Sequence, residues 1–262
     1  FPRFLFLPLY DKTNTSPHTN PIPRRNLMKT FRLFLAACCT TAAAQTPQAF
    51  VEQNFYRKIP SAKCLIGQKG NTCMQLKQTG SAEGLTFLLY TGDNVKLRPN
   101  SRPVTLHAPP YPAEIFVLKQ NNGTWQLKAR SQTQVEAAES GGKPWRFLRF
   151  GTSAWGFENS ISGGRQGYNN FFSSLFVYSG GKFDSYLIIT GMDNTEAGPS
   201  DEEVSLHGTL TPRPDLKQTA GRYPLEIRLT GKNTFKGQSY LLPFKARNND
   251  YSIPENYPVS GF

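Results

Sequence analysis

Arginine and aromatic residues alternate in the middle of the chain, a combination that suits the binding of sugars and anions. Aromatic rings stack on cations and on flat apolar faces, and guanidinium groups pair with phosphate or carboxylate. Aromatic residues in strands usually lie in the core, so the alternative is that these rings are buried. If they are exposed together, they predict a binding surface made of Arg146, Arg149, Trp155, Arg165 and Tyr168. The expected partner of such a surface is an anionic glycan or another acidic polymer.

A second group with chemical potential is a run of acidic residues. Asp193, Glu196 and Asp201 surround a glycine–proline pair, and two further acids follow Asp201, which is the composition of a loop. Carboxylate oxygens at this density can bind calcium, which prefers oxygen ligands. The spacing matches no EF-hand, and a solvated acidic loop is the simpler interpretation. Calcium is therefore the one cofactor left open, and no other is expected.

The residues of hydrolytic enzymes are mostly missing from the chain. The sequence contains no phosphate loop, no H-E-x-x-H and no G-x-G-x-x-G. Its nearest approach to G-x-S-x-G begins at Gly151 but has Trp155 where the final glycine is needed. His107 and His207 are the two histidines beyond the N-terminal region, a hundred positions apart, and each is more typical of a structural residue.

The two cysteines Cys64 and Cys73 predict a disulfide bond. They lie nine positions apart, and Gly67, Gly70 and Asn71 let the chain turn back between them. The alternatives are free thiols in the core or half of a metal site. Zinc needs about four ligands at close spacing, and neither a histidine nor a third cysteine lies nearby.

The first 44 residues have the pattern of a targeting region. Met28, Lys29 and Arg32 form a basic start, residues 33–37 begin a short apolar segment, and residues 42–44 are small alanines. We therefore expect residues 28–44 to be a signal peptide and the mature chain to begin at Gln45. Residues 1–27 are then an untranslated or disordered extension, unless they form a long n-region of the signal.

A second processing route ends at Cys38. Residues 35–38 resemble a lipobox, after which a bacterial lipoprotein is cleaved and acylated on its cysteine. Only ten positions separate Met28 from Cys38, which leaves little room for an apolar segment. The expected location is therefore periplasmic or secreted, with a lipid anchor on Cys38 as the minority alternative.

The charge of the chain limits its partners. The full chain has a net charge of +12; residues 1–44 hold six of the 30 Lys and Arg and one of the 18 Asp and Glu, so residues 45–262 carry +7. That part contains no three consecutive basic residues, which favours a solvated cationic surface over a groove for nucleic acid. No apolar run approaches the roughly 18 residues of a membrane-spanning helix, so no transmembrane segment is expected.

One helix is expected, near the start of the mature chain. Thr46 and Pro47 form an N-cap and a first turn, and Val51, Phe55 and Ile59 repeat at four-residue spacing. The pattern predicts a short helix over residues 47–58.

The rest of the chain predicts strands joined by turns. Only 18% of residues are charged, below the roughly 25% of an average domain, and 22 Gly and 20 Pro punctuate the sequence. The Asn122-Gly123 pair favours a hairpin of residues 114–119 and 125–130, in which Trp125, Leu127 and Ala129 share one face. Further strands are expected at residues 85–91, 145–150, 171–179, 182–190, 204–210, 225–230 and 239–245, with residues 247–262 extended over the surface. The predicted fold is mainly β, a single antiparallel β-sandwich or barrel-like domain over residues 45–262.

Four short motifs occur in order along the chain: Trp155-Gly156-Phe157, Gln166-Gly167-Tyr168, Val177-Tyr178 and Asp193-Asn194. They resemble the motifs of a group of uncharacterised exported β-rich proteins of Gram-negative bacteria, and Phe55-Tyr56 fits the same pattern. The resemblance covers about residues 155–194 and implies an exported bacterial protein. Where similar proteins have Gly-Ala-Cys after Asp-Asn, this chain has Thr195-Glu196-Ala197, so no cysteine chemistry carries over.

Two functions follow as hypotheses. The first is a non-catalytic protein of the cell envelope that binds a ligand or partner. The second is a hydrolase of envelope polymers that uses a histidine, His107 or His207, together with an aspartate. A histidine within hydrogen-bond reach of a carboxylate in a cleft would favour the enzyme.

Overall fold

The computed structural model describes residues 44–59, 64–67, 72–97, 103–105, 111–135, 144–197, 203–232 and 235–259. All of them belong to the structural unit Ala43–Phe262. The predicted extension over residues 1–27, nearly all of the predicted signal peptide, His107 and Asp201 lie outside the described residues.

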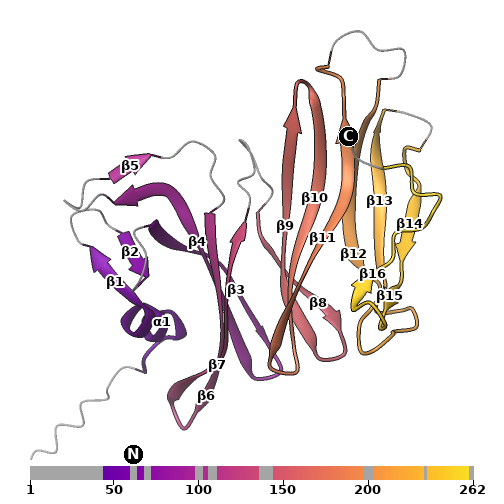
Figure 1. The fold of residues 1–262 in the computed structure, drawn as a ribbon. Coiled ribbons are helices and arrows are strands. Elements are labelled where there is room, and N and C mark those ends of the chain that lie inside the picture. Colours follow the sequence, from indigo (N-terminus) through magenta and orange to yellow (C-terminus); the bar gives the residue numbers. More distant parts are fainter. Residues whose placement is uncertain are drawn as a thin grey trace, which may run out of the picture. The chain divides into compact units, whose positions relative to one another are not determined.

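Sixteen strands and one helix form from the described residues, and the strands build two antiparallel sheets of seven strands and a small pair, β15 (Phe244–Lys245) with β16 (Asp250–Tyr251). The prediction of a mainly β, antiparallel fold is confirmed (Figure 1). Neither seven-stranded sheet closes into a barrel within the described residues, so the arrangement is compatible with a sandwich. No helix in the described part of the chain is long and apolar enough to cross a membrane.

Both sheets are meanders, in which strands adjacent in sequence are adjacent in space. The first contains β1 (Tyr56–Ile59), β2 (Cys64–Gly67), β3 (Thr72–Ala82), β4 (Leu85–Leu97), β6 (Tyr111–Asn121) and β7 (Thr124–Val135), with β5 (Pro103–Thr105) paired to the end of β4. The second contains β8 (Arg146–Gly151), β9 (Ala154–Arg165), β10 (Tyr168–Ser179), β11 (Lys182–Asp193), β12 (Ser205–Pro212), β13 (Leu225–Lys232) and β14 (Ser239–Leu242). Short hairpin connections explain this order, because they leave each strand beside the next.

The two predicted glycine hairpins form as expected. Asn122 and Gly123 have φ angles of 47° and 78°, and Gly180 and Gly181 have 57° and 85°. Two consecutive residues with positive φ define the type I′ turn, whose twist matches that of the flanking strands.

One prediction about the first hairpin is wrong. The register between β6 and β7 shifts between Val117 and Leu118, so that Lys128 is an extra residue in β7. This bulge reverses the alternation: Ala129 packs with the cluster around Phe87, whereas Trp125 packs on the opposite face with the cluster around Val51. Leu127 lies beside the bulge and is 38% exposed. The three residues therefore do not share one face.

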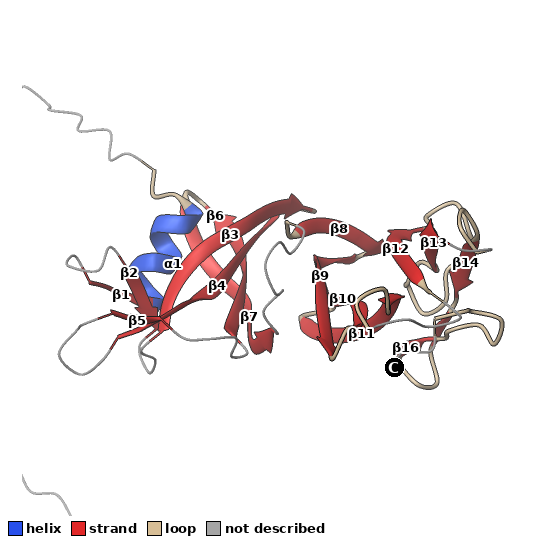
Figure 2. Cartoon of the chain, turned by 90° about the horizontal axis from the view of Figure 1, so that it is seen from above, coloured by secondary structure: helices blue, strands red, loops and turns tan. Residues whose placement is uncertain are grey.

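The predicted helix starts where expected and ends early. α1 (Pro47–Phe55) begins after Thr46, whose Oγ1 accepts a hydrogen bond of 3.1 Å from the Ala49 N–H. The chain then becomes strand β1 rather than continuing to residue 58, because Tyr56 to Ile59 pair with β2. Figure 2 shows α1 beside the first sheet, where the buried Val51 packs with Tyr90 and Phe116.

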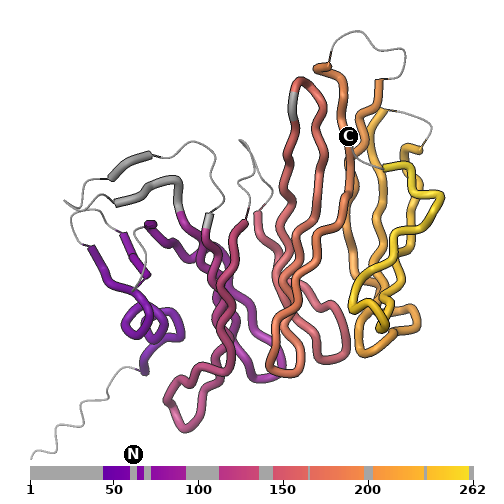
Figure 3. The backbone as a smooth tube through the Cα atoms, in the orientation of Figure 1, coloured from indigo at the N-terminus to yellow at the C-terminus, as the bar shows by residue number. Residues whose placement is uncertain are grey.

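Two other apolar clusters hold the second sheet. One joins the sheets, since Phe87 and Ile115 of the first pack with Phe157 and Phe176 of the second. The other lies on the opposite face of the second sheet and confirms the prediction that Leu225, Ile227 and Leu229 share a face. The backbone after β14 runs alongside the second sheet (Figure 3). Its side chains Tyr251, Tyr257 and Val259 are buried in this cluster and so do not lie on the surface as expected.

Candidate functional site

The second sheet bends until its first strand meets the segment that precedes β13. Gly151 forms an isolated β-bridge with Arg222, and the Tyr223 N–H donates to the Phe150 carbonyl at 2.8 Å. Four strands separate β8 from β13 in the sheet order, so the bridge joins distant parts of the sheet. The bend places the face that carries Arg146 opposite β12.

Arg146 connects β8 to β12 through its side chain. Its Nε donates to Glu158 Oε2 at 2.7 Å, across the β8–β9 register, and one Nη2 N–H donates to the Leu210 carbonyl at 2.9 Å. β8 and β12 are not neighbours in the sheet. The guanidinium group therefore spans the space between two strands that share no backbone ladder.

Glu158 is a buried carboxylate with partners for both oxygens. It is 4% exposed, and the Ser173 hydroxyl donates to its Oε1 at 3.0 Å while Arg146 occupies Oε2. Burying a charge is costly unless it is paired and hydrogen-bonded. The pair Arg146–Glu158 satisfies this requirement and leaves the site close to neutral.

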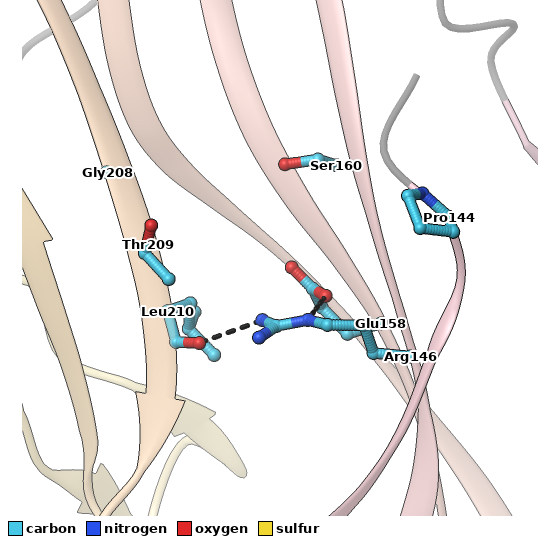
Figure 4. Close-up of a pocket in the computed structure, with 7 residues that line it drawn as sticks. All are labelled: Pro144, Arg146, Glu158, Ser160, Gly208, Thr209 and Leu210. Carbon is cyan, nitrogen blue, oxygen red and sulfur yellow. Dashed lines mark hydrogen bonds and ion pairs between the residues drawn. The ribbon is translucent and has the colours of Figure 1, made fainter. Parts of the chain in front are cut away.

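A small pocket opens beside this ion pair. It has a volume of about 220 Å³ and is lined by Pro144, Arg146, Glu158, Ser160, Gly208, Thr209 and Leu210. Figure 4 shows the Arg146 guanidinium reaching across the space toward Leu210, with Glu158 beside it and Ser160 farther along β9. Pockets for drug-sized ligands measure roughly 300–1,000 Å³, so this one suits a small ligand or one unit of a polymer. It combines a charge pair, two hydroxyls and two apolar side chains.

Of the predicted surface residues, the structure brings Arg149 and Trp155 together. The Arg149 guanidinium lies 5.2 Å from the Trp155 ring, and it donates to the backbone carbonyls of Gly151 at 3.1 Å and Thr152 at 2.9 Å. Trp155 also stacks on Phe147, with ring centroids 5.8 Å apart. The hydrogen bonds of Arg149 therefore stabilise the turn between β8 and β9, and its guanidinium also covers the Trp155 ring.

The other predicted surface residues lie elsewhere. Arg165 and Tyr168 are register partners at the turn between β9 and β10, and Trp155 pairs with Tyr178 near the opposite end of the same hairpin. Ten residues of strand separate Trp155 from Arg165, about 33 Å at the usual rise. Arg146 lies three residues before Arg149 in β8 and thus on the other face. The structure does not gather the five residues into one surface.

The acidic run forms hydrogen bonds within the protein. Asp193 accepts bonds from the Thr195 hydroxyl and the Ser205 hydroxyl, each at 2.7 Å. Partial burial acts to raise the pKa of Asp193, but these bonds outweigh it and lower the pKa below its usual value. Glu196 is exposed and Asp201 lies outside the described residues. Within the described ranges, no group of three or more His, Cys, Asp or Glu side chains is arranged to hold a metal.

His207 lies near Asp193 without a hydrogen bond between them. Its Nε2 is 3.9 Å from Asp193 Oδ2, and its ring lies 4.4 Å from that of Phe171. The side chain is 46% exposed and does not line the pocket, although the next residue, Gly208, does.

Sequence reasoning named Arg146 but missed its partner Glu158, the Ser173 hydroxyl that donates to Glu158, and Ser160 of the pocket lining. An isolated acid between Phe157 and Asn159 was the available signal, because a charged residue inside an aromatic strand needs a partner. The partner became identifiable only from the register that sets Arg146 opposite Glu158.

The fold and the site define a mainly β protein of two antiparallel meanders, with a small polar pocket on the second. Comparison with protein families, curated proteins and solved structures finds no match for the chain.

Proposed function

We propose that the chain is an exported, non-catalytic binding protein of the bacterial cell envelope, and that the pocket between β8 and β12 is its ligand site. The observation that carries the proposal is the Arg146–Glu158 pair, which presents hydrogen-bonding groups at fixed positions beside open space. Polar groups placed precisely in a mostly apolar concavity are characteristic of ligand sites.

Export is supported by three features of the chain. The N-terminal pattern is that of a signal peptide, the motifs of residues 155–194 resemble exported proteins, and Cys64 is bonded to Cys73. Disulfides form and persist in oxidising compartments such as the bacterial periplasm.

The alternative is a hydrolase of envelope polymers that uses His207 and Asp193. Their proximity favours it, since hydrogen bonds between acid–base residues often shorten when substrate binds. Against it, both residues lie outside the pocket lining. Release of reducing ends from envelope polysaccharide, abolished by His207→Ala, would replace the binding proposal with the enzyme.

The ligand site can be tested by filling the pocket. Thr209 is exposed and lines it, so Thr209→Trp should occupy the space without disturbing the core. Thr211→Trp is a matched control on the same face of β12, because Thr211 is exposed and does not line the pocket. Nuclear magnetic resonance titration with oligosaccharide fragments of the envelope should shift the amides of Ser160 and Thr209 in the wild type. The shifts should vanish in Thr209→Trp and persist in Thr211→Trp; equal shifts in both variants would place the site elsewhere.

A further inference from the structure

The charge of the pocket determines which ligands it accepts, an inference that rests on the function proposed above. Among the described residues that line it, only Arg146 and Glu158 have charged side chains, and these are 2.7 Å apart. An anion drawn to the guanidinium would therefore also lie close to the Glu158 carboxylate, and the two interactions oppose each other. A cation faces the reverse conflict. The balance favours an uncharged ligand.

The hydrogen-bonding groups favour hydroxyls. A guanidinium has five N–H donors, and Arg146 uses two of them, which leaves three without a partner among the described residues. The Glu158 oxygens retain lone pairs beyond those that accept from Arg146 and Ser173, and Ser160 and Thr209 each donate and accept. Donors and acceptors thus both line the space, and a hydroxyl group can satisfy both kinds at once.

The apolar lining and the volume complete the match. Pro144 is exposed and offers a C–H surface against which the face of a sugar ring can pack. A space of about 220 Å³ is too small for an oligosaccharide. We infer that the pocket binds one uncharged, hydroxyl-bearing ring, a neutral saccharide unit, in preference to an acidic one.

The test compares two sugars that differ in charge. N-acetylglucosamine and glucuronic acid are titrated separately into the full chain at low and at high salt, and the amides of Ser160 and Thr209 are followed. The neutral sugar should bind at least about fivefold more tightly, the effect expected from one net hydrogen bond or a comparable charge conflict, and its affinity should not change with salt.

Glu158→Gln tests the charge balance itself. The variant keeps the shape of the side chain but leaves the Arg146 charge uncompensated, so glucuronic acid should gain affinity relative to N-acetylglucosamine and its binding should become salt-dependent. If this variant fails to fold, Ser160→Ala serves instead and should weaken the neutral sugar about fivefold through loss of one hydrogen bond. Preference of the wild type for glucuronic acid would overturn the inference and leave the binding function intact. If neither sugar nor any envelope fragment shifts the pocket amides, both proposals fail.

Discussion

Arginine–carboxylate pairs recur inside the protein. Glu114 pairs with Arg130 at 2.8 Å and Glu158 with Arg146 at 2.7 Å. The side chain of Arg222, 6% exposed, bonds to Asp184 at 2.6 Å. Arginine suits these positions because its planar group forms several directed hydrogen bonds and cannot be deprotonated. In the described part of the chain, every ion pair uses arginine or histidine, which leaves the lysines to the solvated surface.

Glu114 should contribute strongly to stability. It accepts hydrogen bonds from the Tyr56 hydroxyl at 3.0 Å, Arg130 at 2.8 Å and Gln132 at 2.9 Å. Glu114→Ala would leave the buried Tyr56 hydroxyl unpaired and remove the partner of Arg130 and Gln132, and we expect the free energy of unfolding to fall by about 3 kcal/mol in urea denaturation. The exposed Glu255 is the control, and Glu255→Ala should change the value little. Equal effects of the two substitutions would contradict this role.

Asp193 should make stability depend on pH on the acidic side. Because hydrogen bonds from Thr195 and Ser205 lower its pKa in the folded state, its contribution is present above the unfolded pKa of about 3.9 and is lost as pH falls through the folded pKa. Wild type should therefore be more stable than Asp193→Asn at pH 7, and the difference should shrink below about pH 4. Urea denaturation at several pH values measures it, with the exposed Glu203→Gln as control. A difference that stays constant down to pH 2 would exclude this linkage.

At the level of elements, turns and bulges set which side chains meet. The positive φ angles at Asn122-Gly123 and Gly180-Gly181 allow tight hairpins. The extra residue Lys128 reverses which face of the sheet the side chains at the start of β7 point to. The register of the β8–β9 hairpin has a further consequence, since it places Arg146 opposite Glu158. The pocket therefore depends on the pairing of strands more than on any local motif.

The hairpin turn can be tested with two glycines that differ only in backbone conformation. A Cβ at Gly123 or at Gly163 would meet no atom within 4 Å, but only Gly123 has a positive φ, of 78°. Gly123→Ala should lower the free energy of unfolding by about 1 kcal/mol through strain, whereas Gly163→Ala should be neutral or slightly stabilising. Thermal denaturation of both variants compares them. A larger loss of stability in Gly163→Ala than in Gly123→Ala would show that steric space, and not backbone conformation, determines the effect of the substitution.

At the scale of the whole molecule, the disulfide and the N-terminal region both bear on the cellular compartment in which the protein is located. The bond from Cys64 to Cys73 joins β2 to β3, with the two Cα atoms 5.3 Å apart, and its cysteines form a small apolar cluster with Ile66. The predicted disulfide is thus confirmed, whereas the signal peptide stays a prediction.

Removal of the disulfide should destabilise the first sheet. The bond closes a short loop of nine-residue separation, and Cys64→Ala/Cys73→Ala should lower the free energy of unfolding by about 2–3 kcal/mol, because the unfolded chain gains freedom. Urea denaturation with and without reductant checks this. Reductant should weaken the wild type and leave the double variant unchanged; a wild type insensitive to reductant would refute the contribution.

Processing of the chain can be read from the intact mass of protein recovered from its native host. We expect the mature product to begin at Gln45, because residues 42–44 are the small residues that signal peptidase selects. A diacylglyceryl adduct on Cys38 would establish the lipid-anchored alternative. A product that retains Phe1 would exclude both routes.

Local patterns were sufficient to predict most elements and the disulfide. The glycine hairpins, the N-cap at Thr46 and the shared face of Leu225, Ile227 and Leu229 depend on neighbours in the sequence, and the structure confirms them. The helix boundary failed because Tyr56 pairs with Gly67 in β2, eleven positions away, and tertiary contacts override local propensity.

The site itself was decided by tertiary structure. Arg146 was identifiable as a chemically capable residue, but its neighbours Glu158 and Leu210 lie 12 and 64 positions away. Strand register brings the first to it, and the bend of the sheet brings the second. Neither contact can be predicted from the periodicity of nearby residues, because strand pairing and sheet bending result from the packing of the whole sheet. The sequence determined the class of fold and the chemical types available; the folded sheet decided which of them face one another.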